Sequence, residues 1–291
     1  MSLDLAAPLE AQTLLFLDLE TTGLERAAGH RICEVALLRE RAGCEEGRFE
    51  SLVAPGRLLD PRAAAVNGLN DQQLAVAPAL PGLAPAIRDL AHDAVLIGHN
   101  LAFDLSFLRG ELGETVFSPL HGPSLDTLIL ARRLLRRRSY SLAALAAELG
   151  APAPTHRAMA DVLATRALFR FLCAQLAERG LITLADVLRF ERGLLPGMPE
   201  PVAPAPFEQA LREGLAVRIV YRSRTLPDAH ERVVRPYALS LEAQGLFVRA
   251  FCELRQELRT FALAKIELAE LVEPPTTLAS AIYAASAAPV T

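Results

Sequence analysis

Residues 14–24, LLFLDLETTGL, place two carboxylates within an apolar run. Side chains alternate between the two faces of a β-strand, so Asp18 and Glu20 point the same way, about 6.5 Å apart along the strand. Two acids on one face of a buried strand repel each other and lose hydration unless cations compensate them. The pair indicates a divalent-metal site, although solvated acids at a strand end are the simpler alternative.

A second acidic segment, in which Asp104 follows an apolar strand, is residues 98–108, GHNLAFDLSFL. Asn100 suits the N-cap of a helix, and Asp104 then lies in the opening turns, where the helix dipole favours an anion. Because a strand ends just before this helix, we expect Asp104 at the carboxyl edge of a sheet, where sites of α/β proteins lie. An acid in a first helical turn is also common for helix stability alone.

The third segment contains His156 and Asp161. Residues five apart lie about 140° apart around a helix, so both cannot share one face of it. We therefore expect His156 in the loop that follows Pro152 and Pro154, and Asp161 on the helix. A His beside a metal-binding carboxylate suits a general base that deprotonates water. Asp126 is most simply the N-cap of another helix, with support of the metal site as the alternative.

These acids together suit two hard cations about 4 Å apart, the arrangement that serves in-line hydrolysis of a phosphodiester. The predicted metal ligands are Asp18, Glu20, Asp104 and Asp161.

The sequence pattern indicates strands first and then interleaved helices, and these elements must position the acids. This order predicts an α/β layer fold. We predict strands at 14–20, 31–40, 48–53 and 94–98, and helices at 81–92, 102–112, 127–138, 141–149 and 157–178. Five arginines gather at the end of the helix 127–138, where a solvated face and a phosphate-binding surface are equally compatible. They are Arg132, Arg133, Arg136, Arg137 and Arg138.

Composition changes in residues 193–206, which contain five prolines and predict an extended linker. A β-rich module follows, with a helix at 207–213 and strands at 216–221, 232–239, 245–251 and 259–264. We predict four parts: a catalytic domain (10–180), a Pro-rich linker (181–206), a small β-rich domain (207–274) and a flexible tail (275–291).

The composition excludes several classes of protein. A hydrophobic fraction of 52% over 291 residues indicates a packed protein and not a disordered one. No apolar run reaches membrane-spanning length, and four scattered cysteines argue against a zinc site or disulfide framework. We expect a soluble, cytoplasmic protein with no membrane partner. The net charge of −4 requires any nucleic-acid surface to be local.

The three acidic segments, in this order, resemble the DnaQ-like exonucleases of the DEDD superfamily, histidine subtype. The motifs are Asp18 to Leu24, Asn100 to Asp104 and His156 to Asp161. The resemblance implies a ribonuclease H-like fold, a mixed sheet flanked by helices. It also implies two Mg²⁺ or Mn²⁺ ions on the four acids, His156 as base, and removal of nucleotides from a 3′ end.

The same resemblance implies a pocket for the terminal nucleotide. Backbone amides would contact the phosphate and Leu24 would pack against a base. Family members that resemble polymerase proofreading subunits often carry His where Asn67 stands, which changes the expected pocket. The implied substrate-binding residues are Thr21, Thr22, Leu24, Asn67, Asn100 and Phe103.

Residues 207–274 resemble the WYL domain of bacterial regulators, with Leu246 and Phe247 in place of the name-giving Trp and Tyr. Such domains are thought to bind nucleic acid or nucleotide-like ligands. Arginines recur on the predicted strands and would form one cationic stripe, or else serve the structure. They are Arg218, Arg222, Arg235, Arg249 and Arg259.

The main hypothesis is a 3′→5′ exonuclease that acts on single-stranded ends, with DNA favoured over RNA, and that the WYL-like module guides or regulates. One alternative is an exoribonuclease that trims RNA 3′ ends. The other is a regulator that binds nucleic acid or nucleotides on a nuclease scaffold.

Overall fold

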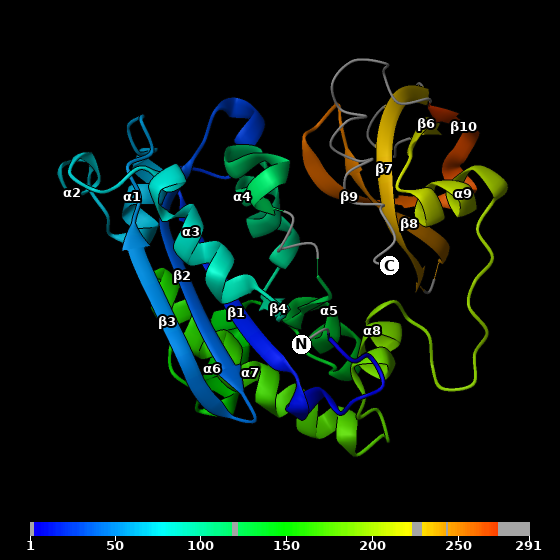
Figure 1. Ribbon diagram of the computed structural model, residues 1–291, viewed down its shortest axis with the longest axis horizontal. Helices are drawn as coiled ribbons and strands as arrows, with labels where there is room; N and C mark the ends of the chain where they lie inside the picture. The colour runs from blue at the N-terminus through cyan, green and yellow to red at the C-terminus, as the bar shows by residue number, and fades with distance from the viewer. Residues whose placement is uncertain (1–2, 118–121, 223–228, 243, 273–291) are drawn as a thin grey trace, which may run out of the picture. The chain divides into compact units, whose positions relative to one another are not determined.

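The computed structural model describes residues 3–117, 122–222, 229–242 and 244–272 (Figure 1). The chain divides into two compact units, Met1–Gly197 and Met198–Thr291. The predicted flexible tail, 275–291, lies outside the described residues.

A five-stranded mixed sheet forms the centre of the first unit, in the order β3-β2-β1-β4-β5. The strands β1, β2 and β3 are antiparallel neighbours, whereas β4 and β5 run parallel to β1. This arrangement confirms the predicted mixed sheet. The bounds are β1 Thr13–Thr21, β2 Ile32–Arg41, β3 Cys44–Leu52, β4 Val95–Gly98 and β5 Ser124–Asp126.

Helices cover both faces of this sheet, with α3 and α4 on one face and α6 and α7 on the other (Figure 1). The helices are α1 Pro61–Asn67, α2 Asp71–Ala75, α3 Leu80–Ala91, α4 Leu101–Phe117, α5 Thr127–Leu134, α6 Leu142–Leu149, α7 Ala158–Ala177 and α8 Leu184–Glu191. Two short 3₁₀ turns, η1 Leu9–Ala11 and η2 Arg26–Ala28, complete the unit.

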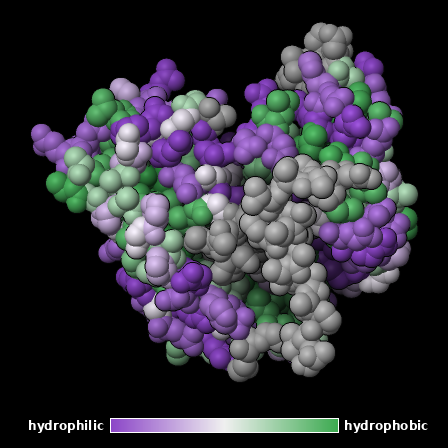
Figure 2. Space-filling model, turned by 45° about the horizontal axis from the view of Figure 1, so that its top comes forward, coloured by the Kyte–Doolittle hydropathy of each residue, from purple (hydrophilic) through white to green (hydrophobic). Residues whose placement is uncertain are grey.

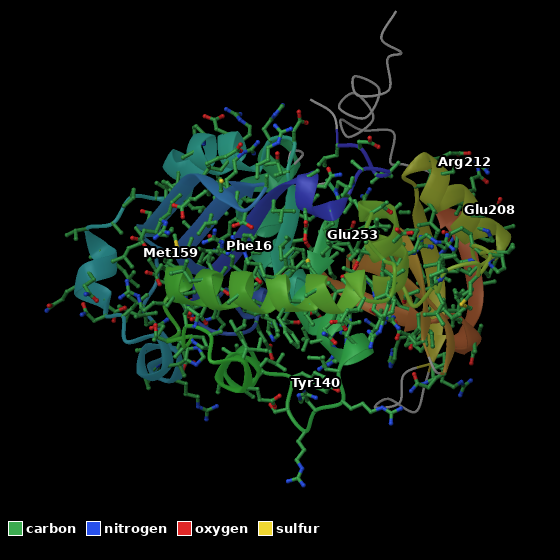
Figure 3. The ribbon with its side chains drawn as sticks, turned by 90° about the horizontal axis from the view of Figure 1, so that it is seen from below. Phe16, Tyr140, Met159, Glu208, Arg212 and Glu253 are labelled. Atoms are coloured by element: carbon green, nitrogen blue, oxygen red, sulfur yellow. The ribbon has the colours of Figure 1, made fainter. Side chains whose placement is uncertain are left out.

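The long helix α7 packs across β1 and β2. Leu14 and Phe16 of β1 face it from the apolar core, and the Phe16 ring meets Phe169 of α7 edge-on at 5.7 Å (Figure 3). Because side chains alternate along the strand, Asp18 and Glu20 continue the same face. They therefore lie beside the N-terminal end of α7, where the apolar packing stops.

Several predicted boundaries differ from the structure, among them those of α5 and of the linker. Helix α5 ends at Leu134 and not at 138, and the Tyr140 hydroxyl donates to the Leu135 carbonyl, 2.9 Å away, just beyond the helix. Helix α8 occupies part of the predicted linker 181–206. Its Leu184, Val187 and Phe190 are buried in the core of the first unit, so burial overrides the extended conformation that the neighbouring prolines favour.

The second unit is an antiparallel sheet in the order β10-β6-β7-β8-β9. Its core includes Phe207, Val217, Val234 and Phe261. The strand β10 was not predicted, because its exposed glutamates weaken the apolar pattern. The bounds are α9 Ala205–Glu213, β6 Ala216–Arg222, β7 Ala229–Glu242, β8 Gly245–Cys252, β9 Glu257–Ala262, η4 Leu263–Lys265 and β10 Ile266–Val272.

The face drawn in Figure 2 mixes hydrophilic and hydrophobic residues in small groups. Within the described part of the chain, every helix is too short or too polar to cross a membrane.

Candidate active site

Three side chains from distant parts of the sequence meet at the end of β1. One ligand atom each from Glu20, His156 and Asp161 lies within 4.8 Å of the others. Asp161 occupies the first turn of α7. His156 is exposed in the preceding loop, with a φ of 57° that non-glycine residues rarely adopt.

The Asp161 carboxylate also holds the loop that carries His156. Its Oδ1 accepts hydrogen bonds from the amides of Thr155 and His156, at 3.0 and 3.1 Å. These bonds tie the imidazole-bearing loop to the first turn of α7. Asp161 therefore both faces the acidic cluster and restrains His156.

Asp104 approaches the same place from α4. Its side chain is 4% exposed, and its Oδ1 accepts a hydrogen bond of 3.1 Å from the Leu19 amide, between the two acids of β1. This bond fixes the beginning of α4 against the end of β1. The structure thus brings all four predicted acids to one edge of the sheet; their role as metal ligands stays a prediction.

Asn100 directly precedes α4, at the predicted N-cap position. Its φ is 67°, whereas an N-cap residue is usually extended. The Asp126 carboxylate, from another strand, accepts from the amides of Asn100 and Leu101 at 2.9 and 3.1 Å and so stabilises the start of α4. Asp126 also caps its own helix α5, as predicted, through the Leu128 amide.

Sequence reasoning missed Glu191 of α8, which is 6% exposed and accepts a 2.8 Å hydrogen bond from the Asp126 amide. The residue lies inside the predicted linker, so no local pattern pointed to it. Through Asp126, Glu191 supports the starts of both α4 and α5.

The carboxylates of the cluster disfavour one another's charge. Burial raises the pKa of Asp18 well above its usual range, and the nearby Asp104, Asp161 and Glu20 raise it further. Burial, then repulsion from Asp161 and Glu34, raises the pKa of Glu20 to about 8. Burial is also the main cause that raises the pKa of Asp104 and of Asp161.

These donors fit divalent cations. Carboxylate oxygens are the ligands that Mg²⁺ and Mn²⁺ prefer, and like charges gathered with little hydration require positive charge between them. The residues that would hold the cations are Asp18, Glu20, Asp104 and Asp161.

Without metal, the melting temperature should fall as the pH rises from about 4.5 to about 8. Glu20 has an ordinary pKa of 4.5 and a folded pKa of about 8, so the folded protein keeps a proton that the unfolded chain releases. This contribution to stability is complete below pH 4.5 and is lost through pH 8. Calorimetry in EDTA measures it; Glu20→Gln should flatten the dependence, and an equal slope in the variant would contradict the prediction.

Two of the predicted nucleotide contacts face into the protein. Thr22 is fully buried; its amide donates to the Arg31 carbonyl at 2.8 Å, and its hydroxyl accepts from the Arg31 amide. Thr21 is also buried and donates its hydroxyl to the Gly23 carbonyl. The Thr22 amide is thus engaged within the protein, whereas Leu24 is 82% exposed; the roles of Thr21, Thr22 and Leu24 in binding a nucleotide stay predictions.

The turn after β1 requires a glycine. A Cβ on Gly23 would lie 2.3 Å from the His30 ring, which itself lies within 3.2 Å of the Thr22 hydroxyl. The ring of His30 thus packs directly on the backbone between the acids and Leu24.

The remaining predicted substrate residues differ in their exposure to solvent. Asn67 is 3% exposed, and its hydrogen bond to Glu20 partly lowers the pKa of that carboxyl. Asn67 therefore supports an acid instead of facing solvent. Phe103 is half-buried and lies 5.0 Å from the Phe107 ring, and Asn100 is exposed.

A fifth carboxylate, Glu34, was also missed. It pairs with Glu20 in the register of β1 and β2, is 5% exposed, and contributes to the raised pKa of both Asp18 and Glu20. The signal was present, because Glu34 interrupts the apolar part of its strand, as Asp18 does in β1.

In the second unit, neighbouring glutamates pair with four of the five arginines of the predicted cationic stripe, and the stripe itself stays a prediction. Four pair with a carboxylate: Arg218 with Glu231 and Glu270, Arg222 with Glu267, Arg235 with Glu253, and Arg259 with Glu257. The fifth, Arg249, is 9% exposed. These residues therefore give no support to a phosphate-binding face.

A mixed sheet flanked by helices, with acids at one edge, defines a ribonuclease H-like exonuclease domain. Residues 15–169, more than half of the chain, match the RNase_T family model, described as an exonuclease. The chain belongs to this family. Residues 205–271 match the model of the WYL domain, so both predicted resemblances are confirmed.

The chain is similar to bacterial proteins that are named as subunits of DNA polymerase III. A DNA polymerase III subunit epsilon-like protein of Rhodobacter capsulatus is 35% identical over 190 residues, 62% of this chain and 26% of that protein. A DNA polymerase III subunit epsilon of Treponema pallidum is 32% identical over 56% of this chain and 77% of its own length. The chain thus spans about a quarter of the Rhodobacter relative.

A solved structure extends the likeness in fold. Exonuclease I of E. coli, in complex with a dA16 oligonucleotide, has a TM-score of 0.51 and 18% identity, and covers 82% of this chain and 55% of its own. At this identity the likeness concerns the fold alone.

Proposed function

We propose that this protein is a divalent-metal-dependent 3′→5′ exonuclease that removes nucleotides from single-stranded DNA. The observation that carries the proposal is the convergence of Glu20, Asp161 and His156 within 4.8 Å, beside Asp18 and Asp104. The names of the relatives, subunits of DNA polymerase III, favour DNA as the substrate. Trimming of RNA 3′ ends is the alternative that the test below distinguishes.

In the proposed reaction, the four acids hold two Mg²⁺ or Mn²⁺ ions. When bound, these ions supply Lewis-acid activation of water and neutralise charge on the phosphodiester. His156 accepts the proton of the attacking water, because its exposed ring lies beside Glu20 and Asp161 while its backbone is anchored. Asp161 keeps the His156 loop in place during this transfer.

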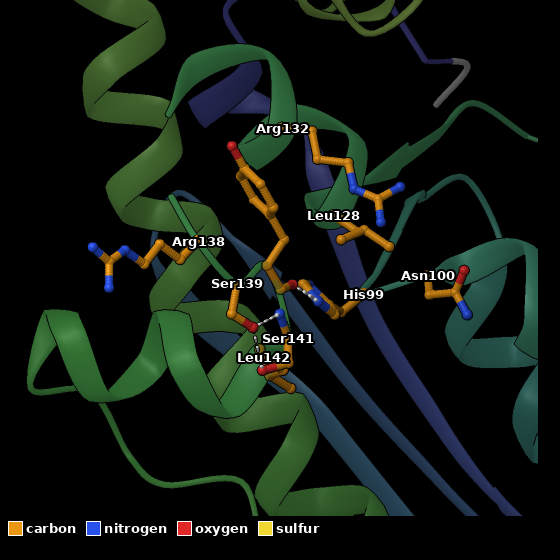
Figure 4. Close-up of a pocket in the computed structure, with 9 residues that line it drawn as sticks. His99, Asn100, Leu128, Arg132, Arg138, Ser139, Ser141 and Leu142 are labelled. Atoms are coloured by element: carbon orange, nitrogen blue, oxygen red, sulfur yellow. Dashed lines mark hydrogen bonds between the residues drawn. The ribbon is translucent and has the colours of Figure 1, made fainter. Parts of the chain in front are cut away.

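A hollow that includes Asn100, just before the helix that carries Asp104, offers a path for the rest of the strand. It has a volume of about 680 Å³ and is lined by His99, Asn100, Leu128, Arg132 and Arg138, with residues 139–142. Figure 4 shows the Arg132 guanidinium on the side of Asn100, whereas Arg138 extends the opposite way. Arg132 is exposed and forms no ion pair within the described residues, so it is available to a backbone phosphate.

Arg132→Ala should weaken binding of single-stranded DNA and reduce the salt dependence of its affinity. Losing one phosphate contact on a single strand lowers the slope of log affinity against log salt by about 0.7. Fluorescence anisotropy in EDTA, over a series of salt concentrations, measures both quantities. Arg137→Ala is the matched control, because Arg137 forms an ion pair with Glu148. An equal change in both variants would show that Arg132 makes no specific contact with the DNA.

Digestion of matched 5′-labelled single-stranded DNA and RNA, with Mg²⁺, Mn²⁺ or EDTA, tests the proposed function. A metal-dependent ladder that shortens from the 3′ end is the expected result, with DNA digested faster than RNA. A faster RNA ladder would favour the exoribonuclease. Salt-dependent binding without hydrolysis under any metal would favour the regulator. Guidance or regulation by the WYL unit stays a prediction.

A further inference from the structure

The carboxylate of Glu34 lies beside the acids of the site, yet its partners are already within the protein. Glu34 stands opposite Glu20 on the neighbouring strand and is 5% exposed. A carboxylate buried to this degree must be compensated by hydrogen bonds and an opposite charge. Arg157 and the first turn of α7 supply both.

The contacts of Glu34 all reach the segment that carries His156. The Arg157 guanidinium donates Nη2 to Oε1 at 2.7 Å and Nε to both carboxylate oxygens at 3.1 Å. The Ala158 amide donates to Oε2 at 3.0 Å. The N-cap residue of α7, Arg157, has no side-chain cap bond of its own. Glu34 therefore caps α7 from a strand 124 residues away in sequence.

His156 thus lies between two anchors. The His156 amide donates a hydrogen bond to Asp161. The next residue, Arg157, is held by its hydrogen bonds and ion pair with Glu34. Between them the His156 backbone has a φ of 57°, a strained conformation that persists only where the surroundings determine it. Free of these anchors, a non-glycine residue would leave the left-handed region.

We propose that Glu34 and Arg157 form a latch that holds His156 against Glu20 and Asp161, so that Glu34 is a positioning residue. The latch rests on the proposed function, since the general base is what it positions. Glu34 and Arg157 carry opposite charges, so neutralising each of them separates two explanations. If these residues act on the acids of the site only through their charge, the two substitutions should change kcat in opposite directions. If they position His156, both substitutions should lower kcat.

The same strand and helix provide a matched control. Glu40 of β2 is 3% exposed and pairs with Arg166 and Arg170 of α7. It lies six residues, about 20 Å along the strand, from Glu34. Glu40→Gln therefore removes a buried ion pair between the same two elements, far from His156.

The experiment compares Glu34→Gln, Arg157→Gln and Glu40→Gln in the full chain, with 5′-labelled single-stranded DNA and saturating Mg²⁺. We expect both latch variants to lose kcat by about 10–100-fold with KM changed less than threefold. Glu40→Gln should keep kcat within about twofold while its melting temperature falls. Equal kcat in latch and control variants, or opposite effects of Glu34→Gln and Arg157→Gln, would overturn the latch.

A second readout does not depend on turnover. The Cε1–H resonance of His156 should be single and dispersed in the wild type and in Glu40→Gln, and broadened or shifted to its unstructured position in both latch variants. An unchanged resonance in the latch variants would overturn the proposal. If the wild type hydrolyses nothing but the resonance responds, the proposed function fails and the latch stands. Arg157 is half exposed, so Arg157→Gln remains informative if Glu34→Gln does not fold.

Discussion

Asp18→Ala should abolish hydrolysis of a 5′-labelled oligonucleotide while the protein stays folded. Burial and four neighbouring carboxylates raise the pKa of Asp18, which therefore lies at the centre of the acidic cluster. Removing it takes away a ligand from the centre of the proposed metal site. Losing about 4 kcal/mol of transition-state stabilisation corresponds to a rate loss of about 10³-fold or more. Single-turnover assays with Mg²⁺ measure this loss.

The stability of the variant separates a lost function from a lost fold. Because Asp18 is repelled by Asp104, Asp161 and Glu20, its removal should leave the melting temperature in EDTA unchanged or raise it. Added Mg²⁺ should stabilise the wild type more than the variant, because ligands that bind only the folded state raise its stability. Retained activity of Asp18→Ala with Mg²⁺ would contradict the assignment of the metal site.

His156→Ala should lower kcat by about 10²–10⁴-fold, the usual contribution of a general base. The side chain is exposed in a loop, so its removal leaves the core intact and KM little changed. Steady-state kinetics on single-stranded DNA measure both constants. His92→Ala is the control, because His92 is also exposed and lies in the same unit. A variant that keeps kcat within twofold would exclude His156 as the base.

The titration of Mg²⁺ distinguishes the base from a metal ligand. The His156 ring lies close enough to Glu20 and Asp161 to coordinate a cation. If it were a ligand, His156→Ala would raise the Mg²⁺ concentration needed for half-maximal rate. For a base, that concentration should stay the same while the maximal rate falls.

Local periodicity predicted the acids of β1 correctly. Alternation along a strand requires only neighbouring residues, so the shared face of Asp18 and Glu20 follows from the run of leucines around them. The five-residue spacing likewise placed His156 in a loop and Asp161 on a helix, as the structure has them. The roles of these residues as ligands and base stay predictions.

Capping and linker structure were harder to predict, because both depend on distant partners. Asn100 stands directly before α4, as expected, but the first amides there donate to the carboxylate of Asp126 from another strand. Within the predicted linker, Pro206 lies in the first turn of α9, and α8 precedes the prolines and is buried against the first unit. No local pattern contains this information.

The sequence by itself determined the order and type of the acidic motifs, the α/β class and the presence of a separate C-terminal module, because each depends on short-range patterns. Only the tertiary structure decided which charges meet. Glu34 and Arg157 are 123 residues apart, and strand register with the docking of α7 brings them together beside His156. The arginines of the second unit likewise look cationic in sequence, but Arg218 forms ion pairs with Glu270, which stands opposite it on β10, and with Glu231 of β7. Charge compensation is a property of neighbours in space, which sequence spacing alone does not determine.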